Sequence, residues 1–334
     1  MNSSNVTRLR NSLGWRTRYA SATWYPISIL PVDSRRAKRS DGRSKHSGCN
    51  EHPDEICNEP VRFHVRQRFP GNWMPTKCFP GNEDTTNRKY ETGNTVWPGS
   101  IVLLKYLEKL AHCHLLDDDG SKIHNETQNI NQSDLFIGKA VADLGSGTSI
   151  TTLASALLGA DLVVCTDGDD HVVSLAASNV KDAILELDGQ TSHLTENCGD
   201  EIHDDNETNL FDVRGCKVEV RKYLWGDGNL ATELSANGID SKYFDIILCA
   251  DCIVPKLYPI EPLINAIHEL SAEATITYLS YERRHYSEYD PAVEFRRLAG
   301  LRKLHVEVVP DEDLNQMYPA DDIEIWKVRR LFNE

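Results

Sequence analysis

The stretch Lys139-Ala-Val-Ala-Asp-Leu-Gly-Ser-Gly-Thr148 decides the fold. Its first five residues are typical of a short buried strand, and a helix is expected to begin at Ile150. Glycines between a strand and a helix allow a tight turn and let a ligand come close to the backbone. The dinucleotide pattern G-x-G-x-x-G is incomplete, because Ile150 stands where its third glycine belongs. A pyrophosphate ligand therefore fits this loop poorly.

The next segment supplies the acid that such a loop needs. Residues 150–158 predict a helix and residues 161–166 a second buried strand, which together with the first strand form one βαβ unit. Asp167 follows 22 residues after Gly145, where an acid can accept hydrogen bonds from both hydroxyls of a ribose. Asp143, at the start of the loop, suits a cationic ligand. S-adenosylmethionine has an amino group, a sulfonium and a ribose but no phosphate, and it matches these features.

The pattern of strand and helix continues along the chain. Strands are expected at 218–225, 244–249 and 274–281, and helices at 171–187, 259–270 and 291–299. No helix separates the strands expected at 304–309 and 323–328, so these two should be antiparallel. A helix at 101–111 and a strand at 61–69 precede the repeating part. The sequence thus predicts an α/β, Rossmann-like fold with a mostly parallel sheet and ligands at the carboxyl ends of the strands.

Composition narrows the class of protein. Of 334 residues, 40% are hydrophobic and 26% charged, and no apolar run reaches the length of a membrane span. The net charge of -15 disfavours nucleic acid and a membrane surface, and favours a basic partner. Nine cysteines in a long chain predict free thiols rather than a disulfide framework. Cys249 and Cys252 form one C-x-x-C without a second pair, so no metal site is expected.

Charge is distributed unevenly. Residues 1–50 contain 10 Lys and Arg against 2 Asp and Glu, a local charge of +8 in an acidic chain. We expect residues 1–58 to be a disordered basic extension that cofactor binding does not need, and residues 59–334 to form the domain. Acidic, polar insertions are expected near 117–133 and 189–215. The lack of a secretory signal favours a cytoplasmic protein, while the Arg- and Ser-rich start leaves a mitochondrial transit peptide as the alternative.

Several motifs jointly resemble the seven-stranded protein lysine methyltransferases, over roughly residues 60–330. The family-level motifs are Asp143 to Thr148, Leu158 to Asp167, Leu224-Trp-Gly226 and Ala250-Asp251. Within that family, the likeness is greatest to members that act on valosin-containing protein, a hexameric AAA ATPase. The residues behind that finer likeness are Val96-Trp97, Ile101 to Glu108, Ala250 to Ile253, Glu261-Pro-Leu263, Tyr281-Glu-Arg283 and Asp321 to Ile325.

The resemblance implies which residues contact S-adenosylmethionine. They are Trp97, Asp143, Gly145, Ser146, Gly147, Thr148, Asp167, Trp225 and Ala250. Trp225 is expected at the end of a strand, where its flat ring could cover an adenine. For Asp167 the alternative is a helix-capping acid, and for both tryptophans it is a place in the core.

The acceptor side is expected around Asp251, at the end of a central strand. A carboxylate there can hold an incoming ammonium, so Asp251 is the expected catalytic and substrate-binding residue. The family pattern at this point is Asp-x-x-Tyr, but the fourth residue here is Val254. Tyr258 or Tyr281 could replace the missing aromatic wall. The resemblance also places Glu282 near the substrate entrance, against the alternative of a solvated turn.

The sequence therefore predicts a monomeric methyltransferase that modifies a lysine of a protein, with a valosin-containing-protein-like ATPase as the implied substrate. One alternative keeps the enzyme class and changes the acceptor to another protein residue, an elongation factor or a small amine. A second, suggested by Val254, is a non-catalytic adaptor of a chaperone or ATPase that retains the cofactor fold. A nicotinamide-dependent oxidoreductase is a third, against which the missing glycine counts.

Overall fold

The computed structural model describes residues 24–32, 60–67, 92–112, 135–189, 209–228, 230–236, 244–254, 257–284, 286–287 and 289–332. Ten strands are found in these ranges: β1 Trp24–Ile29, β2 Val61–Arg66, β3 Ala140–Leu144, β4 Leu162–Asp167, β5 Leu210–Val213, β6 Cys216–Lys222, β7 Phe244–Ala250, β8 Ser271–Glu282, β9 Leu304–Val308 and β10 Ile323–Arg330. The α-helices are α2 Pro98–His112, α3 Ile150–Leu157, α4 Asp170–Leu187, α5 Leu230–Ala236, α6 Ile260–Leu270 and α7 Pro291–Leu301, with 3-10 turns at Thr92–Asn94 and Asp311–Asp313.

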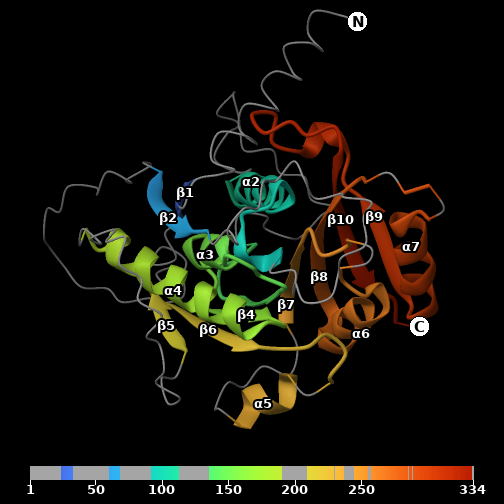
Figure 1. The fold of residues 1–334 in the computed structure, drawn as a ribbon, viewed down its shortest axis with the longest axis horizontal. Helices are drawn as coiled ribbons and strands as arrows, with labels where there is room; N and C mark the ends of the chain where they lie inside the picture. Colours follow the sequence, from blue (N-terminus) through green and yellow to red (C-terminus); the bar gives the residue numbers. More distant parts are fainter. Residues whose placement is uncertain are drawn as a thin grey trace, which may run out of the picture.

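The central sheet has eight strands in the order β5-β6-β4-β3-β7-β8-β10-β9 (Figure 1). Strands β6, β4, β3, β7 and β8 are parallel, whereas β10 is antiparallel to both β8 and β9. This confirms the predicted α/β class with an antiparallel C-terminal pair. The chain leaves β3 toward β4 on one side and reaches β7 on the other. The crevice of such a sheet opens at the carboxyl ends of the strands where this order reverses.

Helices bury both faces of this sheet. One core packs α2, α3 and α4 against it, and contains Leu103, Leu153 and Val180. The second packs α5, α6 and α7 on the opposite face, around Leu263, Phe295 and Trp326. Parallel strands buried on two sides need continuous apolar sequence, which runs such as Phe244–Ala250 provide. Among the described residues, no helix combines the length and apolarity required to cross a membrane.

Residues 24–32 differ from the expected disordered extension. They form β1, which pairs antiparallel with β2, and Tyr25, Ile27 and Ile29 alternate into the core. Apolar residues at alternate positions indicate a strand with one buried face. The surrounding basic composition led instead to the prediction of disorder. The rest of the predicted extension, including residues 1–23, lies outside the described residues. The predicted insertion at 117–133 also lies outside them.

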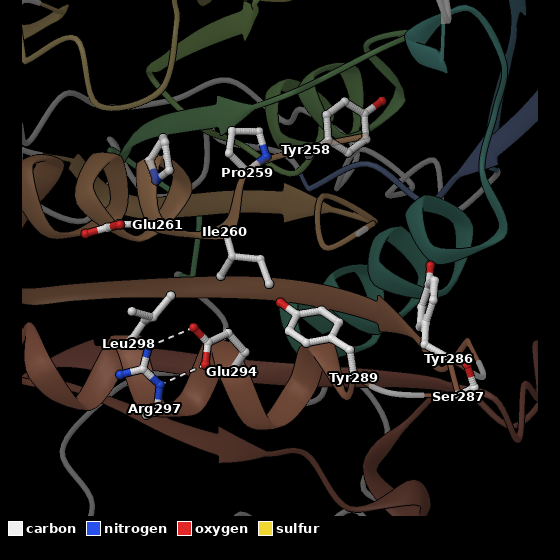
Figure 2. A pocket seen from close by; sticks show the side chains of 11 residues that line it. Tyr258, Pro259, Ile260, Glu261, Tyr286, Ser287, Tyr289, Glu294, Arg297 and Leu298 are labelled. Atoms are coloured by element: carbon white, nitrogen blue, oxygen red, sulfur yellow. Dashed lines mark hydrogen bonds and ion pairs between the residues drawn. The ribbon is translucent and has the colours of Figure 1, made fainter. Parts of the chain in front are cut away.

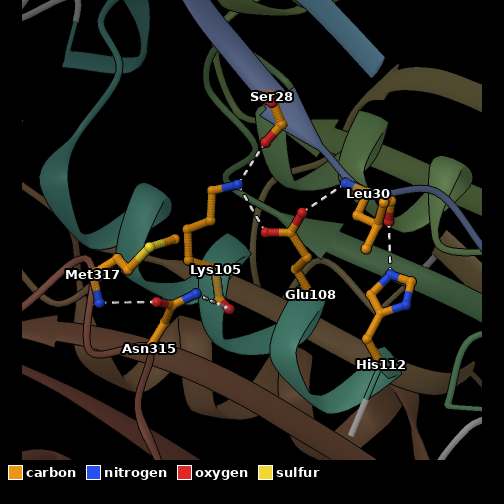
Figure 3. A network of polar contacts seen from close by, with 7 residues as sticks. All are labelled: Ser28, Leu30, Lys105, Glu108, His112, Asn315 and Met317. Carbon is orange, nitrogen blue, oxygen red and sulfur yellow. Dashed lines mark hydrogen bonds and ion pairs between the residues drawn. The ribbon is translucent and has the colours of Figure 1, made fainter. Parts of the chain in front are cut away.

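A polar network ties β1 to α2, as Figure 3 shows. Lys105 Nζ donates to the Ser28 carbonyl at 2.5 Å and to Glu108 at 2.7 Å. Glu108 in turn accepts from the Leu30 backbone N–H at 2.6 Å, and His112 Nε2 lies 2.8 Å from the Leu30 carbonyl. A lysine is rarely buried unless it is paired, and Lys105 meets that condition through β1. The strand is therefore an integral part of the domain.

The end of the second predicted insertion is also structured. Residues 210–213 form β5, an edge strand antiparallel to β6, and Arg214-Gly215 makes the tight turn between the two strands. Gly215 has φ 92°, a value that side chains rarely adopt. The remaining part of that insertion, 190–208, lies outside the described residues.

Removal of residues 1–32 should lower the melting temperature, because it exposes the hydrophobic surface under Tyr25, Ile27 and Ile29 and leaves Lys105 without its carbonyl partner. Burial of three such side chains stabilises by several kcal/mol, so we expect a decrease of about 5–15 °C by scanning calorimetry. A chain lacking only residues 1–20 is the matched control and should melt within about 2 °C of the full chain. Equal melting temperatures for both truncations would contradict a structural role for β1.

Candidate active site

The glycine loop closes the carboxyl end of β3. Gly145 and Gly147 have φ of 68° and 55°, in the left-handed region that favours glycine. The Ser146 N–H donates to the Thr166 carbonyl at 2.9 Å, which anchors the loop to the end of β4. The helix α3 begins directly after the loop, at Ile150. The strand, glycine loop and helix that the sequence predicts are therefore confirmed as local structure.

Asp143 is buried beneath the loop and bonded to α3 through one of its two oxygens. Its carboxylate is fully buried, and one oxygen accepts from the hydroxyls of Thr151 and Thr152, each at 2.7 Å. Burial raises the pKa of Asp143 to about 6, while the two threonine hydroxyls oppose that shift. This geometry fixes the first turn of α3 beneath the loop. The observed contacts of Asp143, which was expected to bind the cofactor, thus hold the glycine loop on α3.

Ser146 and Thr148 are likewise bonded to protein. The Ser146 hydroxyl accepts from the Cys165 thiol at 3.0 Å, and the Thr148 carbonyl accepts from Asn179 Nδ2 at 3.1 Å. Both residues are buried. The Ser146 hydroxyl thus holds the loop against β4, and the Thr148 carbonyl holds it against α4.

Asp167 ends β4 beside the glycine loop. Its two oxygens accept from the backbone N–H groups of Gly147 at 3.2 Å and Asp169 at 3.3 Å. Burial raises the pKa of Asp167, and the N–H groups of Asp169, Gly147 and Gly168 oppose this increase. The neighbouring Asp169, rather than Asp167, caps α4, because it accepts from the His171 N–H. Asp167 therefore caps no described helix, and its carboxylate lies beside the glycine loop.

Trp225 lies over Gly145, although it does not end a strand as predicted. Strand β6 stops at Lys222, and Trp225 stands in the following turn at Gly226, which has φ 79°. A Cβ built on Gly145 would come within 2.9 Å of the Trp225 ring and 3.1 Å of Cys252 Sγ. Only glycine leaves room for this stacking. Tyr258 packs on the other side of Trp225, with ring centroids 5.8 Å apart.

Trp97 is brought to the crevice by the segment before α2. The Val96 N–H donates to Gln67 Oε1 at 2.8 Å, and the Trp97 carbonyl accepts from the backbone N–H and hydroxyl of Ser100. In the same segment, the Gly93 carbonyl lies 3.0 Å from the position that a Cβ on Gly147 would take. Trp97 is half-buried, and Gly93 of the same segment is the residue that reaches the glycine loop.

Asp251 is the most unusual residue of the site. It follows Ala250, the last residue of β7, with a φ of 58°, which is uncommon for a residue other than glycine. Its N–H donates to the Ser280 hydroxyl at 3.0 Å. The carboxylate is almost completely buried. Its charged partner is the Arg284 guanidinium at 3.6 Å, and neither oxygen makes a close, well-aligned hydrogen bond within the described residues. Strained residues with unpaired buried groups are concentrated at functional sites.

Arg284 belongs to the site, although the sequence analysis did not predict it as a site residue. Its Nη2 lies 2.6 Å from Glu282 Oε2 and 3.6 Å from Asp251 Oδ1, and its guanidinium stacks over Trp97 with the Cζ atom 5.3 Å from the ring centroid. The guanidinium is thus hydrogen-bonded to Glu282 and leaves the Asp251 oxygens open. The only indication in the sequence was the charged run Glu282-Arg-Arg284 at the end of β8. Such a run is also typical of a solvated turn.

The proposed substitutes for the aromatic at Val254 differ in position. Tyr281 is buried, and its ring packs on Trp326 with centroids 5.0 Å apart, in the core that faces α7. The Val254 carbonyl accepts from the N–H groups of Leu257 and Tyr258, and the resulting turn places Tyr258 against Trp225. Tyr258 is therefore the aromatic residue beside the crevice.

The charge state of Asp251 follows from its surroundings. Burial raises its pKa to about 6, Arg284 opposes this shift and Glu282 adds to it, while the N–H groups of Glu282 and Gly99 also favour the charged form. The carboxylate is thus ionised at neutral pH. A residue larger than glycine would not fit at position 99, because its Cβ would lie 3.0 Å from the Asp251 carboxylate.

Comparison with known proteins identifies the class. A family model described as lysine methyltransferase matches residues 82–213, which include the glycine loop and Asp167. Over these residues the chain is similar to the lysine methyltransferase family. It is a protein-lysine methyltransferase that depends on S-adenosylmethionine. The match ends before Asp251, so the acceptor side of the site rests on its geometry.

Solved structures give weaker likenesses. A TehB-like methyltransferase from Corynebacterium glutamicum is 15% identical, with 66% of this chain and 95% of that chain covered and a TM-score of 0.36. The ribosomal protein L11 methylase from Lactobacillus delbrueckii subsp. bulgaricus is 15% identical, with 58% and 71% covered and a TM-score of 0.35. A 16S rRNA methyltransferase from T. thermophilus is 13% identical, with 93% and 51% covered and a TM-score of 0.40. These values say nothing about the acceptor.

The crevice residues suit S-adenosylmethionine. The glycine loop lies beneath Trp225, an acid suited to a ribose stands beside it, and the described part of the crevice holds no cluster of cations that would demand a phosphate. Across β3 from Asp167, the buried Asp251 carboxylate stands at the end of β7. Donor side and acceptor side thus share one edge of the sheet.

Asp167→Ala should weaken S-adenosylmethionine binding by about 10- to 100-fold, since a hydrogen bond to a charged acceptor contributes roughly 1.5–3 kcal/mol. Isothermal titration calorimetry measures this directly. Asp161→Ala, which removes an exposed acid at the start of the same strand, is the matched control and should bind like the unmodified protein. Unchanged affinity in Asp167→Ala would argue against the ribose role.

Asp251→Asn should stabilise the protein. The folded state binds the Asp251 proton more tightly than the unfolded chain does, so this residue costs stability as the pH rises from about 4 through about 6. The cost is full above that range. We expect urea unfolding to show a gain of up to about 3 kcal/mol at pH 8 and about half as much at pH 5. A loss of stability at pH 8 would mean that the carboxylate has a structural role.

Proposed function

We propose that this methyltransferase binds the side-chain ammonium of a substrate lysine at Asp251. The observation that carries the proposal is the Asp251 carboxylate itself. It is buried and strained, it lies 3.6 Å from the Arg284 guanidinium, and it makes no close, well-aligned hydrogen bond in the described residues. An ammonium would supply the missing donors in a charge-assisted bond. On the same edge of the sheet, the glycine loop, Asp167, Trp225, Trp97 and Ala250 would bind the cofactor. Asp143, Ser146 and Thr148 would hold the loop in shape.

The chemistry needs a neutral amine. S-adenosylmethionine supplies an electrophilic methyl group on its sulfonium. For a lysine with an ordinary pKa near 10.4, loss of the proton at about pH 7.4 costs roughly 4 kcal/mol. The proton would pass to water before the amine attacks the methyl group and S-adenosylhomocysteine leaves. The Asp251 carboxylate favours the ammonium and adds to that cost, whereas two other features of the site reduce it. The buried surroundings disfavour any charge, and the Arg284 guanidinium disfavours a second cation nearby. Asp251 and Trp97 would then orient the amine while they exclude water.

Glu282 would act through Arg284. It lies 2.6 Å from the Arg284 guanidinium, which it keeps from bonding to Asp251. Tyr258, rather than the buried Tyr281, would supply the aromatic wall that the family pattern has at the position of Val254. Tyr281 would support the end of β8 from the core.

For the protein substrate, we propose a valosin-containing-protein-like AAA ATPase. The support is the set of sequence motifs around Trp97, Asp251, Glu261 and Tyr281 together with the acidic chain, whose net charge of -15 favours a basic surface. The proposed compartment is the cytoplasm. The domain would comprise residues 24–32 as well as the part that begins near residue 59.

A methyl-transfer assay tests the reaction and the substrate together. The full-length enzyme is incubated with labelled S-adenosylmethionine and either valosin-containing protein or a cell extract, and labelled bands are examined by mass spectrometry. We expect label on a lysine of the ATPase, and a decrease of at least 100-fold in Asp251→Ala, which should still bind the cofactor. Asp161→Ala is the control.

Each of the other outcomes rejects one part of the proposed function. Label on a different lysine-containing band keeps the reaction and rejects the ATPase as substrate. Label on a residue other than lysine rejects the proposed acceptor. Cofactor binding without label on any band would favour the adaptor that Val254 suggests.

A further inference from the structure

A groove of about 700 Å³ lies between the start of α6 and the segment that connects β8 to α7 (Figure 2). One wall is built by Tyr258, Pro259 and Ile260, and the facing wall by Tyr286, Tyr289 and Leu298. In the close-up, Ile260 points toward the Tyr289 wall, and Tyr258 and Tyr286 stand on opposite sides. The groove is thus lined by aromatic and aliphatic side chains with phenolic hydroxyls.

The fold holds these walls in place. Asp290 caps α7 by accepting from the Ala292 N–H at 2.9 Å, which fixes the chain directly after Tyr289. Pro259 precedes α6, where its fixed backbone angle favours the start of a helix. A groove with rigid walls binds an extended segment at lower entropic cost than a mobile surface does.

The groove adjoins both halves of the proposed active site. At one end, Tyr258 packs on Trp225, which covers the glycine loop. On the other wall, Tyr286 is close enough to Arg284 and Glu282 for their charges to act on its hydroxyl. The groove therefore adjoins residues that contact the site, because Arg284 lies 3.6 Å from Asp251.

The charges at the groove favour a segment that is not acidic. Among the described residues, the lining side chains that are charged at neutral pH are Glu261, Glu294 and Arg297. Arg297 donates twice to Glu294, with both distances 2.7 Å, so the charges of these two residues offset each other. The described lining therefore offers an acidic peptide no open cation, and Glu261 would repel it.

We propose that this groove binds the residues next to the methylated lysine, as an extended segment with proline or aliphatic side chains and no acidic ones. The proposal rests on the function proposed above, and it adds the chemistry of the substrate sequence. Aromatic-lined grooves bind extended, proline-containing segments because the rings pack on flat, preordered surfaces. Tyrosine adds area and hydrogen bonds with little loss of side-chain freedom.

The test uses the full chain and an oriented peptide library, in which one lysine is fixed and three positions on each side are varied. With labelled S-adenosylmethionine, the enzyme should prefer Pro, Leu, Ile and Val over Asp and Glu beside the lysine, by about 10-fold or more. Tyr289→Ala and Tyr286→Ala should lose this preference and raise KM for the preferred peptide by about 10-fold, with an unchanged affinity for S-adenosylmethionine.

Leu301→Ala is the matched control. Leu301 ends α7, is 70% exposed and does not line the groove, so its removal should leave both the preference and KM as they are. A preference that is absent, or that survives both tyrosine substitutions, would overturn the proposal while the reaction itself stands.

A second measurement separates the groove from the reaction. Fluorescence anisotropy of labelled peptides reports binding without turnover, with Ala-Pro-Leu-Lys-Leu-Pro-Ala as the probe and Ala-Asp-Glu-Lys-Glu-Asp-Ala as its acidic counterpart. Tighter binding of the first, weakened by Tyr289→Ala, supports the groove even if no lysine is methylated. Equal binding of the two peptides, or binding of neither, would overturn the proposal.

Discussion

The backbone pairing of β3 with β4 on one side and with β7 on the other positions everything else in the candidate site. In a parallel sheet the carboxyl ends of neighbouring strands lie side by side, so this pairing sets the glycine loop next to Asp167 and Asp251. Residues more than a hundred positions apart in the sequence thereby face one crevice. The proposed reaction needs both Asp167, at the end of β4, and Asp251, directly after β7. The common edge of the sheet brings these two acids to the same crevice.

A second layer of contacts orients the aromatic residues of the crevice. Strand β2, which pairs antiparallel with β1, packs on α4, where Arg66 contacts Asp182 and Asn179. Gln67, directly after β2, accepts from the Val96 N–H and so fixes the residue before Trp97. Arg284 then stacks on that tryptophan. Crevice geometry thus depends on a strand that precedes the methyltransferase core in sequence.

Periodicity and turn chemistry were sufficient for the parallel sheet, because each buried strand and its following helix carry a local signal. The same reasoning located the loop, Asp167 and Asp251. It failed for β1, whose alternating Tyr25, Ile27 and Ile29 lie in a segment with a disordered-looking composition. It also failed for Arg284 and for the burial of Asp143 and Tyr281. The direction in which a side chain points depends on long-range packing, which spacing along one chain does not encode.

The place of β10 in the sheet has a consequence for how the enzyme forms during synthesis. This strand follows β9 in the chain, yet it lies between β8 and β9, and the Arg283 N–H donates to the Asp322 carbonyl at 2.7 Å. Until residues 323–330 have left the ribosome, β8 has an open edge and Trp326 is missing from beside Tyr281 and Phe295. The acceptor side, to which the end of β8 contributes Glu282 and the following Arg284, can therefore be completed only after the cofactor side has already been made.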